Sequence, residues 1–578
     1  MIFSPEFTVS DIPLVEYPRP QFRRDSYLSL NGEWEYCIKK DKEIPSQFSG
    51  KIIVPYSPES ELSGVKRQLQ SDEFLFYKRI FTLPENFAKK NVILNVGACD
   101  QITTIIINGK VVGEHKGGYL SFSFDITDYL LDRENEIIFI VTDDASSDVY
   151  GRGKQKYKRG GIWYTATSGI WQSVWLENVP EKYLTSVKLL PELDTKKLFI
   201  TPISSFDGDV YVEILDGNNL ITSKYCKANT KTEIDVSKCK EWTTDNPELY
   251  RVVMTFDDDV VESYFGLRKF SSIVINNKKY FALNNKPIFH NGLLDQGYWH
   301  DGIYTPKTNK TMFDEVKAVK DLGFNMLRKH IKVEPMLWYY YCDILGVLVW
   351  QDMINGGGEY PFYRIALCPF FNLKIDDTNY KKMKRSEQSR EWYFNEAIGL
   401  IEQLYNCVSI CLWTPFNEAW GQFDAFNVWK KLVKIDNSRL YDHASGWQDK
   451  GGGDLNSRHI YFRKIKMKND YRRILSLTEF GGYSYALKGH VFTNKKFGYK
   501  GYKSADDLQK AYEKLYKTEI FPAIIKDGLS ATVYTQLSDV EDEINGLFTY
   551  DRILKFDGEK VKEINSELYN VFIEAITK

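Results

Sequence analysis

The stretch Ile410-Cys411-Leu412-Trp413-Thr414-Pro415-Phe416-Asn417-Glu418 joins a short apolar run to an amide and a carboxylate. The run predicts a buried strand, because it is short, apolar and followed by proline. Similar runs recur after residue 273 and alternate with amphipathic segments, in one of which Met312, Val316 and Val319 share a helical face. Eight strand and helix pairs in roughly 300 residues predict a (β/α)8 TIM barrel over residues 273–578. The candidate strands span residues 288–293, 324–329, 347–351, 409–414, 440–443, 459–461, 474–479 and 532–536.

The sequence before the barrel has an all-β pattern. Between residues 1 and 182, β-branched and aromatic runs such as 74–82 are separated by turn residues such as Asn108-Gly109. This pattern predicts a jelly-roll β-sandwich. Residues 183–272 continue with short strands and close turns, and they predict a smaller immunoglobulin-like β-sandwich. The expected fold class is therefore a multidomain β plus α/β protein.

Composition narrows the range of partners. The formal net charge of −2 argues against nucleic acid, because phosphate binding needs a basic surface. The apolar run at residues 344–350 is far too short to cross a membrane. No signal peptide is visible, so we expect a cytoplasmic protein. The eight cysteines lack metal-ligand spacing, and we expect no metal and no cofactor. The sequence leaves open whether copies of the chain form a homo-oligomer.

Two glutamates follow candidate strands, where a TIM barrel has its active site. Glu418 follows the fourth strand, and Glu479 ends the seventh strand, on the opposite side of the barrel mouth. Glycosidic cleavage needs one protonated carboxyl to help the leaving oxygen depart and one ionised carboxylate to attack the anomeric carbon. Either glutamate alone is more often an ordinary loop acid. The two together, on facing strands, favour catalysis.

Several motifs resemble glycoside hydrolase family 2. Trp413-Thr414-Pro415-Phe416-Asn417-Glu418 is similar to the family's Asn-Glu signature. Gly113-Glu114-His115-Lys116-Gly117-Gly118-Tyr119 and Gly169-Ile170-Trp171-Gln172-Ser173-Val174-Trp175 resemble parts of its sugar-binding domain. Phe265-Gly266-Leu267-Arg268 resembles the junction that leads into its barrel. The order and spacing of these motifs, which cover nearly the whole chain, make the resemblance specific.

The resemblance implies roles for residues at matching positions. Glu418 is expected to be the acid/base, Glu479 the nucleophile, and Asn417 the ligand of the sugar 2-hydroxyl. Arg328 and His330, at the end of the second strand, match an arginine and a histidine of the family. Arg328 could keep the nucleophile ionised or form a structural ion pair inside the barrel.

Further candidates follow from position at strand ends. Tyr461 could orient the nucleophile or fill the core. Trp350, Trp413 and Trp447 could form a sugar platform, although Trp413 could also only pack. Reading of sugar hydroxyls is expected from four polar residues, with a solvated loop acid as the alternative for the second and the fourth. They are Asp295, Asp352, Gln536 and Asp539.

The function predicted from these features is a retaining exo-β-glycosidase with a carbohydrate substrate, the best guess being a β-galactoside. A β-glucuronidase or β-mannosidase of the same family and an inactive carbohydrate-binding protein are the alternatives. The triplet Asn494-Lys495-Lys496 has the letters of the Asn-x-Lys element with which family β-glucuronidases bind the sugar carboxylate. It lies soon after the nucleophile rather than in the usual place, and we interpret it as a chance match.

Overall fold

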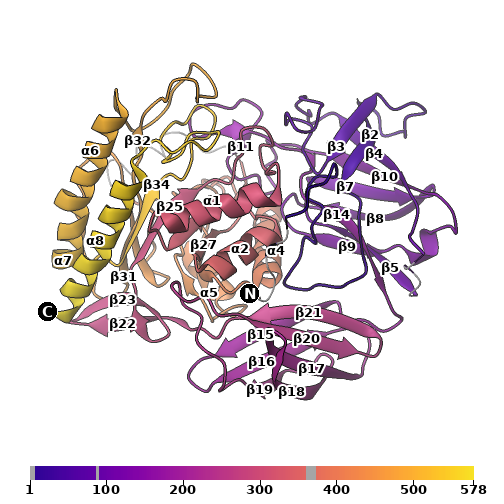
Figure 1. Cartoon of the computed structure of the whole chain (residues 1–578). Helices are drawn as coiled ribbons and strands as arrows, with labels where there is room; N and C mark the ends of the chain where they lie inside the picture. Colours follow the sequence, from indigo (N-terminus) through magenta and orange to yellow (C-terminus); the bar gives the residue numbers. More distant parts are fainter. Residues whose placement is uncertain (1–4, 6, 86, 88–89, 359–372) are drawn as a thin grey trace.

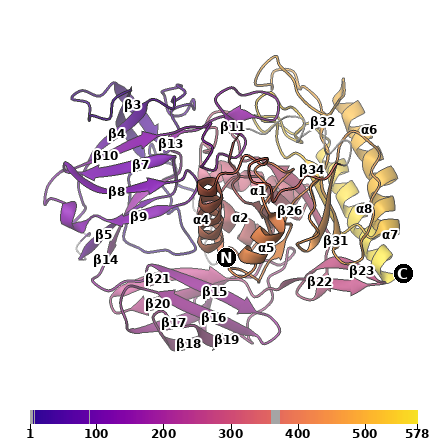
Figure 2. The same ribbon diagram turned by 180° about the vertical axis from the view of Figure 1, so that it is seen from behind.

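A computed structural model of the chain describes residues 5, 7–85, 87, 90–358 and 373–578. It consists of two β-sandwiches and a barrel, with the first sandwich beside the barrel and the second next to both (Figures 1 and 2). The expected order of fold types is confirmed. The boundaries at residues 182 and 272 stay predictions. The first falls between β14 (Val174–Val179) and β15 (Ser186–Glu192), and the second falls inside β22 (Phe270–Ile275).

The first sandwich packs two antiparallel sheets face to face. Trp34, Tyr77 and Phe139 are buried between them, and alternating inward-facing residues of both sheets complete the core. The first sheet contains β1 (Tyr27–Ser29), β14, β5 (Asn91–Val96) and β9 (Phe122–Asp125). The second contains β3 (Gly50–Val54), β2 (Gly32–Lys39), β4 (Phe74–Phe81), β10 (Asn135–Thr142), β7 (Ile102–Ile107) and β8 (Lys110–Lys116).

The second sandwich is smaller and its strands alternate strictly between buried and exposed residues, as in β16 (Lys197–Ile203). One sheet is formed by β15, β16 and β19 (Thr232–Asp235). The other is formed by β18 (Asn219–Lys227), β17 (Asp209–Asp216), β20 (Tyr250–Phe256) and β21 (Asp259–Phe265). Arg24 ties the two sandwiches together through Glu177 and Asp259, both at 2.8 Å.

The barrel has eight parallel strands, and the neighbours are hydrogen-bonded from β29 round to β30. The sixth strand begins at Leu455, four residues before its expected start at His459, so His459 is near the strand's end. The strands, in chain order, are β25 (His290–Asp295), β26 (Met326–Lys329), β27 (Leu348–Asp352), β28 (Ile410–Thr414), β29 (Leu440–Tyr441), β30 (Leu455–Ile460), β31 (Ile474–Gly481) and β34 (Ala531–Thr535).

Helices cover the outside of the barrel. α1 (Asn309–Asp321) begins where the Thr308 side chain accepts a hydrogen bond from the Thr311 amide, and it buries Met312, Val316 and Val319 as expected. The others are α2 (Met336–Leu345), α4 (Glu387–Leu404), α5 (Ala425–Leu432), α6 (Ala505–Leu515), α7 (Phe521–Asp527) and α8 (Gly558–Thr577). Among the described residues, no helix combines the length and apolar character that crossing a membrane requires.

The first sandwich meets the barrel in two places. Beside α4, Gln403 accepts hydrogen bonds from the amide and the hydroxyl of Ser121, both at 2.9 Å. Glu396 lies so close to Gly117 that a Cβ there would come within 2.5 Å of its carboxylate oxygen. At the barrel mouth, residues 151–165 form a segment, here called the sandwich arm, that contains β11 (Gln155–Lys156). Both views show β11 between the sandwich and the barrel (Figures 1 and 2).

Candidate active site

Glu479 ends the buried part of β31 and is held by two neighbours. Nη1 of Arg328 donates to Oε1 of Glu479 at 3.1 Å, and the Tyr461 hydroxyl donates to Oε2. The same guanidinium donates to both oxygens of Asp352, at 3.1 and 3.0 Å. Arg328 therefore makes an ion pair and positions Glu479 at the same time, so its two predicted roles coincide. A fixed cation and a hydroxyl donor favour the ionised form of Glu479.

Glu418 lies just past β28, where the backbone turns sharply. Its φ of 51° and that of Ala419, 64°, lie in the left-handed region, which is costly for residues with a Cβ. The strained turn is fixed by the Glu418 amide, which donates to the Ser445 carbonyl at 3.0 Å. Strain of this kind at a strand end directs the carboxylate into the barrel mouth.

His459 joins the two glutamates. The parallel pairing of β30 and β31 places His459 beside Glu479, and its Nδ1 lies 2.8 Å from Oε1 of Glu418 and 3.5 Å from Oε2 of Glu479. One ligand atom from each of the three residues lies within 4.8 Å of the others, so the set could also hold a cation. The two carboxylates are therefore close enough to flank a single bond.

A chain of hydroxyl groups indicates where the proton of this pair lies. The Thr478 hydroxyl donates to the Arg458 carbonyl at 3.3 Å, and the Ser445 hydroxyl donates to Thr478 at 3.1 Å. Ser445 Oγ, 3.2 Å from Nε2 of His459, is then left to accept from that nitrogen. In a neutral imidazole, Nδ1 must consequently be the acceptor, and Glu418 donates the proton to it. The arrangement suits Glu418 as the protonated partner.

Asn417 and His330 present unused polar atoms beside the glutamates. Among the described residues, Nδ2 of Asn417 and Nε2 of His330 are buried without a hydrogen-bond partner. Burial and, next, Lys154 lower the pKa of His330 to about 4, so its ring is neutral at physiological pH. Its Nδ1 donates to Asp352 at 2.7 Å, which leaves Nε2 as an acceptor. One amide donor and one imidazole acceptor are thus available to sugar hydroxyls.

Asp352 supports this cluster from behind. Burial opposes ionisation of Asp352, but Arg328 and His330 outweigh it and hold its pKa below the usual value. Both carboxylate oxygens are engaged by these two residues. The expectation of a solvated loop acid is therefore wrong. Asp352 orients Arg328 and His330 instead.

The predicted aromatic platform is only partly present. Trp350 is fully buried and its indole donates to His290 at 3.0 Å, near the start of β25. It packs in the lower barrel, so its assignment to the platform is wrong. Trp413 only packs, with its indole donating to Asp436 at 2.9 Å. Trp447 is half-buried, and its indole donates to the His459 carbonyl at 3.3 Å, which keeps it beside the glutamates.

Three of the predicted hydroxyl readers are instead bound in buried networks. Asp295 accepts from Nζ of Lys329 at 2.5 Å, and Asp539 from Nζ of Lys555 at 2.7 Å. Gln536 exchanges hydrogen bonds with Gln296 and Asn545, at 2.9 and 2.8 Å. These partners occupy the polar atoms that a sugar would need. The structure therefore corrects their assignment from sugar binding to structural roles.

The sequence analysis missed His459 because it placed the sixth strand four residues late. With β30 ending at Ile460, His459 and Tyr461 follow the period-2 alternation of a strand and both point to the mouth. Tyr461 stacks on Tyr499, with ring centroids 4.0 Å apart. A polar residue two positions before the candidate Tyr461 is the signal that could have found His459.

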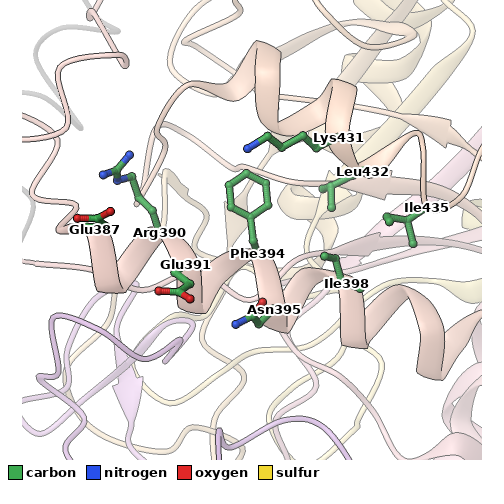
Figure 3. Close-up of a pocket in the computed structure, with 9 residues that line it drawn as sticks. All are labelled: Glu387, Arg390, Glu391, Phe394, Asn395, Ile398, Lys431, Leu432 and Ile435. Atoms are coloured by element: carbon green, nitrogen blue, oxygen red, sulfur yellow. The ribbon is translucent and has the colours of Figure 1, made fainter.

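A separate groove lies on the outside of the barrel (Figure 3). Glu387 and Phe394 of α4 and Lys431 of α5 line it, and Nζ of Lys431 lies 4.5 Å from the ring centre of Phe394. None of the residues that line it belongs to the glutamate cluster. It offers a place for control substitutions on the same barrel.

An eight-stranded barrel with two facing glutamates at its mouth is typical of glycoside hydrolases. A model of "Glycosyl hydrolases family 2, sugar binding domain" matches residues 67–180, and one of "Glycosyl hydrolases family 2, TIM barrel domain" matches residues 273–572. The chain belongs to glycosyl hydrolase family 2.

Curated relatives carry two kinds of name. A protein of Formosa agariphila named "Putative beta-glucuronidase" is 26% identical over 427 residues, which cover 70% of this chain and 47% of the relative. A beta-galactosidase of Thermoanaerobacter pseudethanolicus is 22% identical over 498 residues, 81% of this chain and 62% of the relative. The chain thus spans about half to three fifths of the length of these relatives.

Solved structures share the fold along nearly the whole chain. A β-D-glucuronidase of Dictyoglomus thermophilum superposes with a TM-score of 0.73 at 17% identity, covering 96% of this chain and 99% of that one. A β-galacturonidase of Eisenbergiella tayi, bound to galacturonate, has a TM-score of 0.70 at 17% identity, with the same coverage.

Proposed function

We propose that the protein is a retaining exo-acting β-glycosidase. The observation that carries the proposal is the approach of one oxygen of Glu418 and one of Glu479 to within 4.8 Å, bridged by His459. Retaining glycosidases have carboxyl groups about 5–5.5 Å apart, whereas inverting enzymes need about 6.5–9.5 Å to admit a water molecule. The short separation therefore supports double displacement.

In the first step, Glu479 attacks the anomeric carbon while Glu418 gives its proton to the departing glycosidic oxygen. The C–O bond to the leaving group breaks as the ester bond to Glu479 forms. In the second step Glu418, now ionised, takes a proton from water, which attacks the same carbon and releases Glu479. Asn417 would donate to the sugar 2-hydroxyl, a contact that strengthens in the transition state.

The surroundings of the mouth support cleavage of terminal sugars. The sandwich arm covers one side, where the Tyr164 hydroxyl donates to Glu543, and Arg159 pairs with Asp542 at 3.1 Å. A covered side suits a pocket for one terminal residue better than an open channel for a polysaccharide. The relatives' names include both β-galactosidase and β-glucuronidase, and the sugar itself is argued in the next subsection.

Substitution of the two glutamates tests the assignment. Glu479→Ala should abolish turnover of every aryl β-glycoside, because the covalent intermediate cannot form. Glu418→Ala should retain activity on substrates with good leaving groups, which need little protonation. Azide should rescue Glu418→Ala with a β-azide product, because attack occurs on the α-linked intermediate. With Glu479→Ala, azide should attack directly and give the α-azide.

The product's anomeric configuration, read by NMR, decides between the two roles. An α-azide from Glu418→Ala would mean that the roles are exchanged. Unchanged turnover in both variants would remove the proposal altogether. Glu387→Ala, on the outer groove (Figure 3), is the matched control and should behave like the unmodified protein.

A further inference from the structure

The sandwich arm brings one lysine of the first domain to the barrel mouth. The amides of Arg152 and Gly153 both donate to the Asn355 carbonyl at 3.0 Å, just beyond β27. Gly153 lies so close to the end of β26 that a Cβ there would approach the Ile331 carbonyl to 2.9 Å. The Lys154 carbonyl accepts from the Tyr164 amide at 3.0 Å. These backbone contacts hold Lys154 against the strand ends.

The Lys154 side chain is enclosed by residues of the catalytic end. It is only 9% exposed, and its Nζ lies 5.2 Å from the ring centre of Trp420 and 6.0 Å from that of Tyr164. Trp420 follows the acid/base Glu418 by two residues, and Tyr164 holds Glu543. The positive charge also acts on His330: after burial, Lys154 is the second cause of that imidazole's lowered pKa. The ammonium thus faces the unused imidazole nitrogen.

Lys154 differs from the other buried lysines of the barrel. Lys329, Lys332 and Lys555 each contact a carboxylate at 2.5–2.9 Å. Among the described residues, Lys154 forms no hydrogen bond or ion pair through its ammonium group, and only the two aromatic rings approach it. A buried ammonium without an anionic partner is costly. An enclosed charge at the mouth of a sugar site is therefore suited to a charge on the sugar.

We propose that Lys154 binds the carboxylate of a β-linked uronic acid and makes the protein selective for acidic over neutral sugars. The inference rests on the proposed function, a retaining β-glycosidase. A single ammonium matches one carboxylate, which is the charge that oxidation of C6 places on a hexose. The exposed triplet Asn494-Lys495-Lys496 lies outside this enclosure. The competing role for Lys154 is a general countercharge to Glu418, Glu479 and Glu543.

Paired substrates distinguish these roles. We expect the unmodified protein to cleave 4-nitrophenyl β-D-glucuronide or β-D-galacturonide at least about tenfold faster in kcat/KM than the matching glucoside or galactoside. The methyl ester of the preferred uronide, which has the same shape without the charge, should be as poor a substrate as the neutral sugars. Lys154→Met should reduce kcat/KM for the uronide by about 10²-fold or more, because a buried charge pair is lost. Activity on the neutral glycoside and the ester should change less than threefold, by roughly the scatter expected of a surface substitution.

Two further variants act as controls. Lys154→Arg keeps the charge and should retain part of the preference for the acid. Lys156→Met, two residues along the same arm, removes an ammonium that lies 4.1 Å from the Trp163 ring and should leave the preference unchanged. Thermal melting verifies that each variant is folded.

Three outcomes would overturn the inference. Faster cleavage of neutral glycosides by the unmodified protein would refute it while leaving the proposed function intact. An equal loss on acidic and neutral substrates in Lys154→Met, with a shifted pH profile, would make Lys154 a countercharge only. Failure to cleave any β-glycoside would refute the proposed function, and the inference with it.

Discussion

The contact between His459 and Glu418 makes this histidine a positioning residue for proton transfer. His459→Ala removes the acceptor of the Glu418 proton and the bridge to Glu479, at 2.8 and 3.5 Å. We expect kcat to fall by about 10²-fold on substrates with poor leaving groups and much less on activated aryl glycosides, because only the former need the proton. KM should stay nearly constant. Steady-state kinetics across a leaving-group series measures the difference.

Ser445→Ala provides the matched test, because Ser445 contacts only the far nitrogen of His459. It should weaken the preference for one tautomer and shift the limb of the pH–rate profile in the same direction as His459→Ala, with a smaller loss. An equal fall on all leaving groups in both variants would show a purely structural role.

Buried networks at the strand ends decide the element-level prediction. Asp295 closes β25 by pairing with Lys329, which also contacts Glu334 at 2.7 Å. Asp295→Ala leaves Lys329 with one fewer counter-ion inside the barrel, and such losses typically cost about 3–5 kcal/mol. We expect a markedly lower midpoint in chemical denaturation and an unchanged ranking of substrates. A normal midpoint with an altered ranking would return Asp295 to the sugar pocket.

The same networks show how far sequence reasoning reaches. Hydrophobic period identifies each barrel strand, and strand ends locate Glu418 and Glu479, because both signals are local. Asp295 and Gln536 have the same local signal, but their partners Lys329 and Asn545 are brought in by other strands and loops. The role of Lys154 depends on packing between two domains, which leaves no local pattern in the sequence. Long-range pairing is what separates a catalytic acid from a structural one.

The interface between the first sandwich and α4 makes stability depend on pH across the whole molecule. Burial raises the pKa of Glu396 to about 7 from an ordinary 4.5, and its side chain is 7% exposed. The folded state therefore holds a proton that the unfolded state has lost between pH 4.5 and 7, so stability falls as pH rises through that window. Below pH 4.5 there is no penalty, and above pH 7 it reaches roughly 3 kcal/mol at most.

Glu396→Gln keeps the neutral form at every pH. It should melt at a higher temperature than the unmodified protein at pH 8 and at the same temperature near pH 4.5. Differential scanning calorimetry at both values checks the sign. A variant that is less stable at pH 8 would show that the Glu396 carboxylate makes a favourable contact when ionised.

The docking of the sandwich arm links the inheritance of two domains. Tyr164 and Arg159 of the first domain hold Glu543 and Asp542 of the barrel, and the Thr165 amide donates to Glu541 at 3.1 Å. A recombination event that joined this barrel to a foreign sandwich would deprive three adjacent acids of their partners at once. The arm and the segment after β34 must therefore change together during evolution, and a chimera intended to function has to carry both across the same crossover.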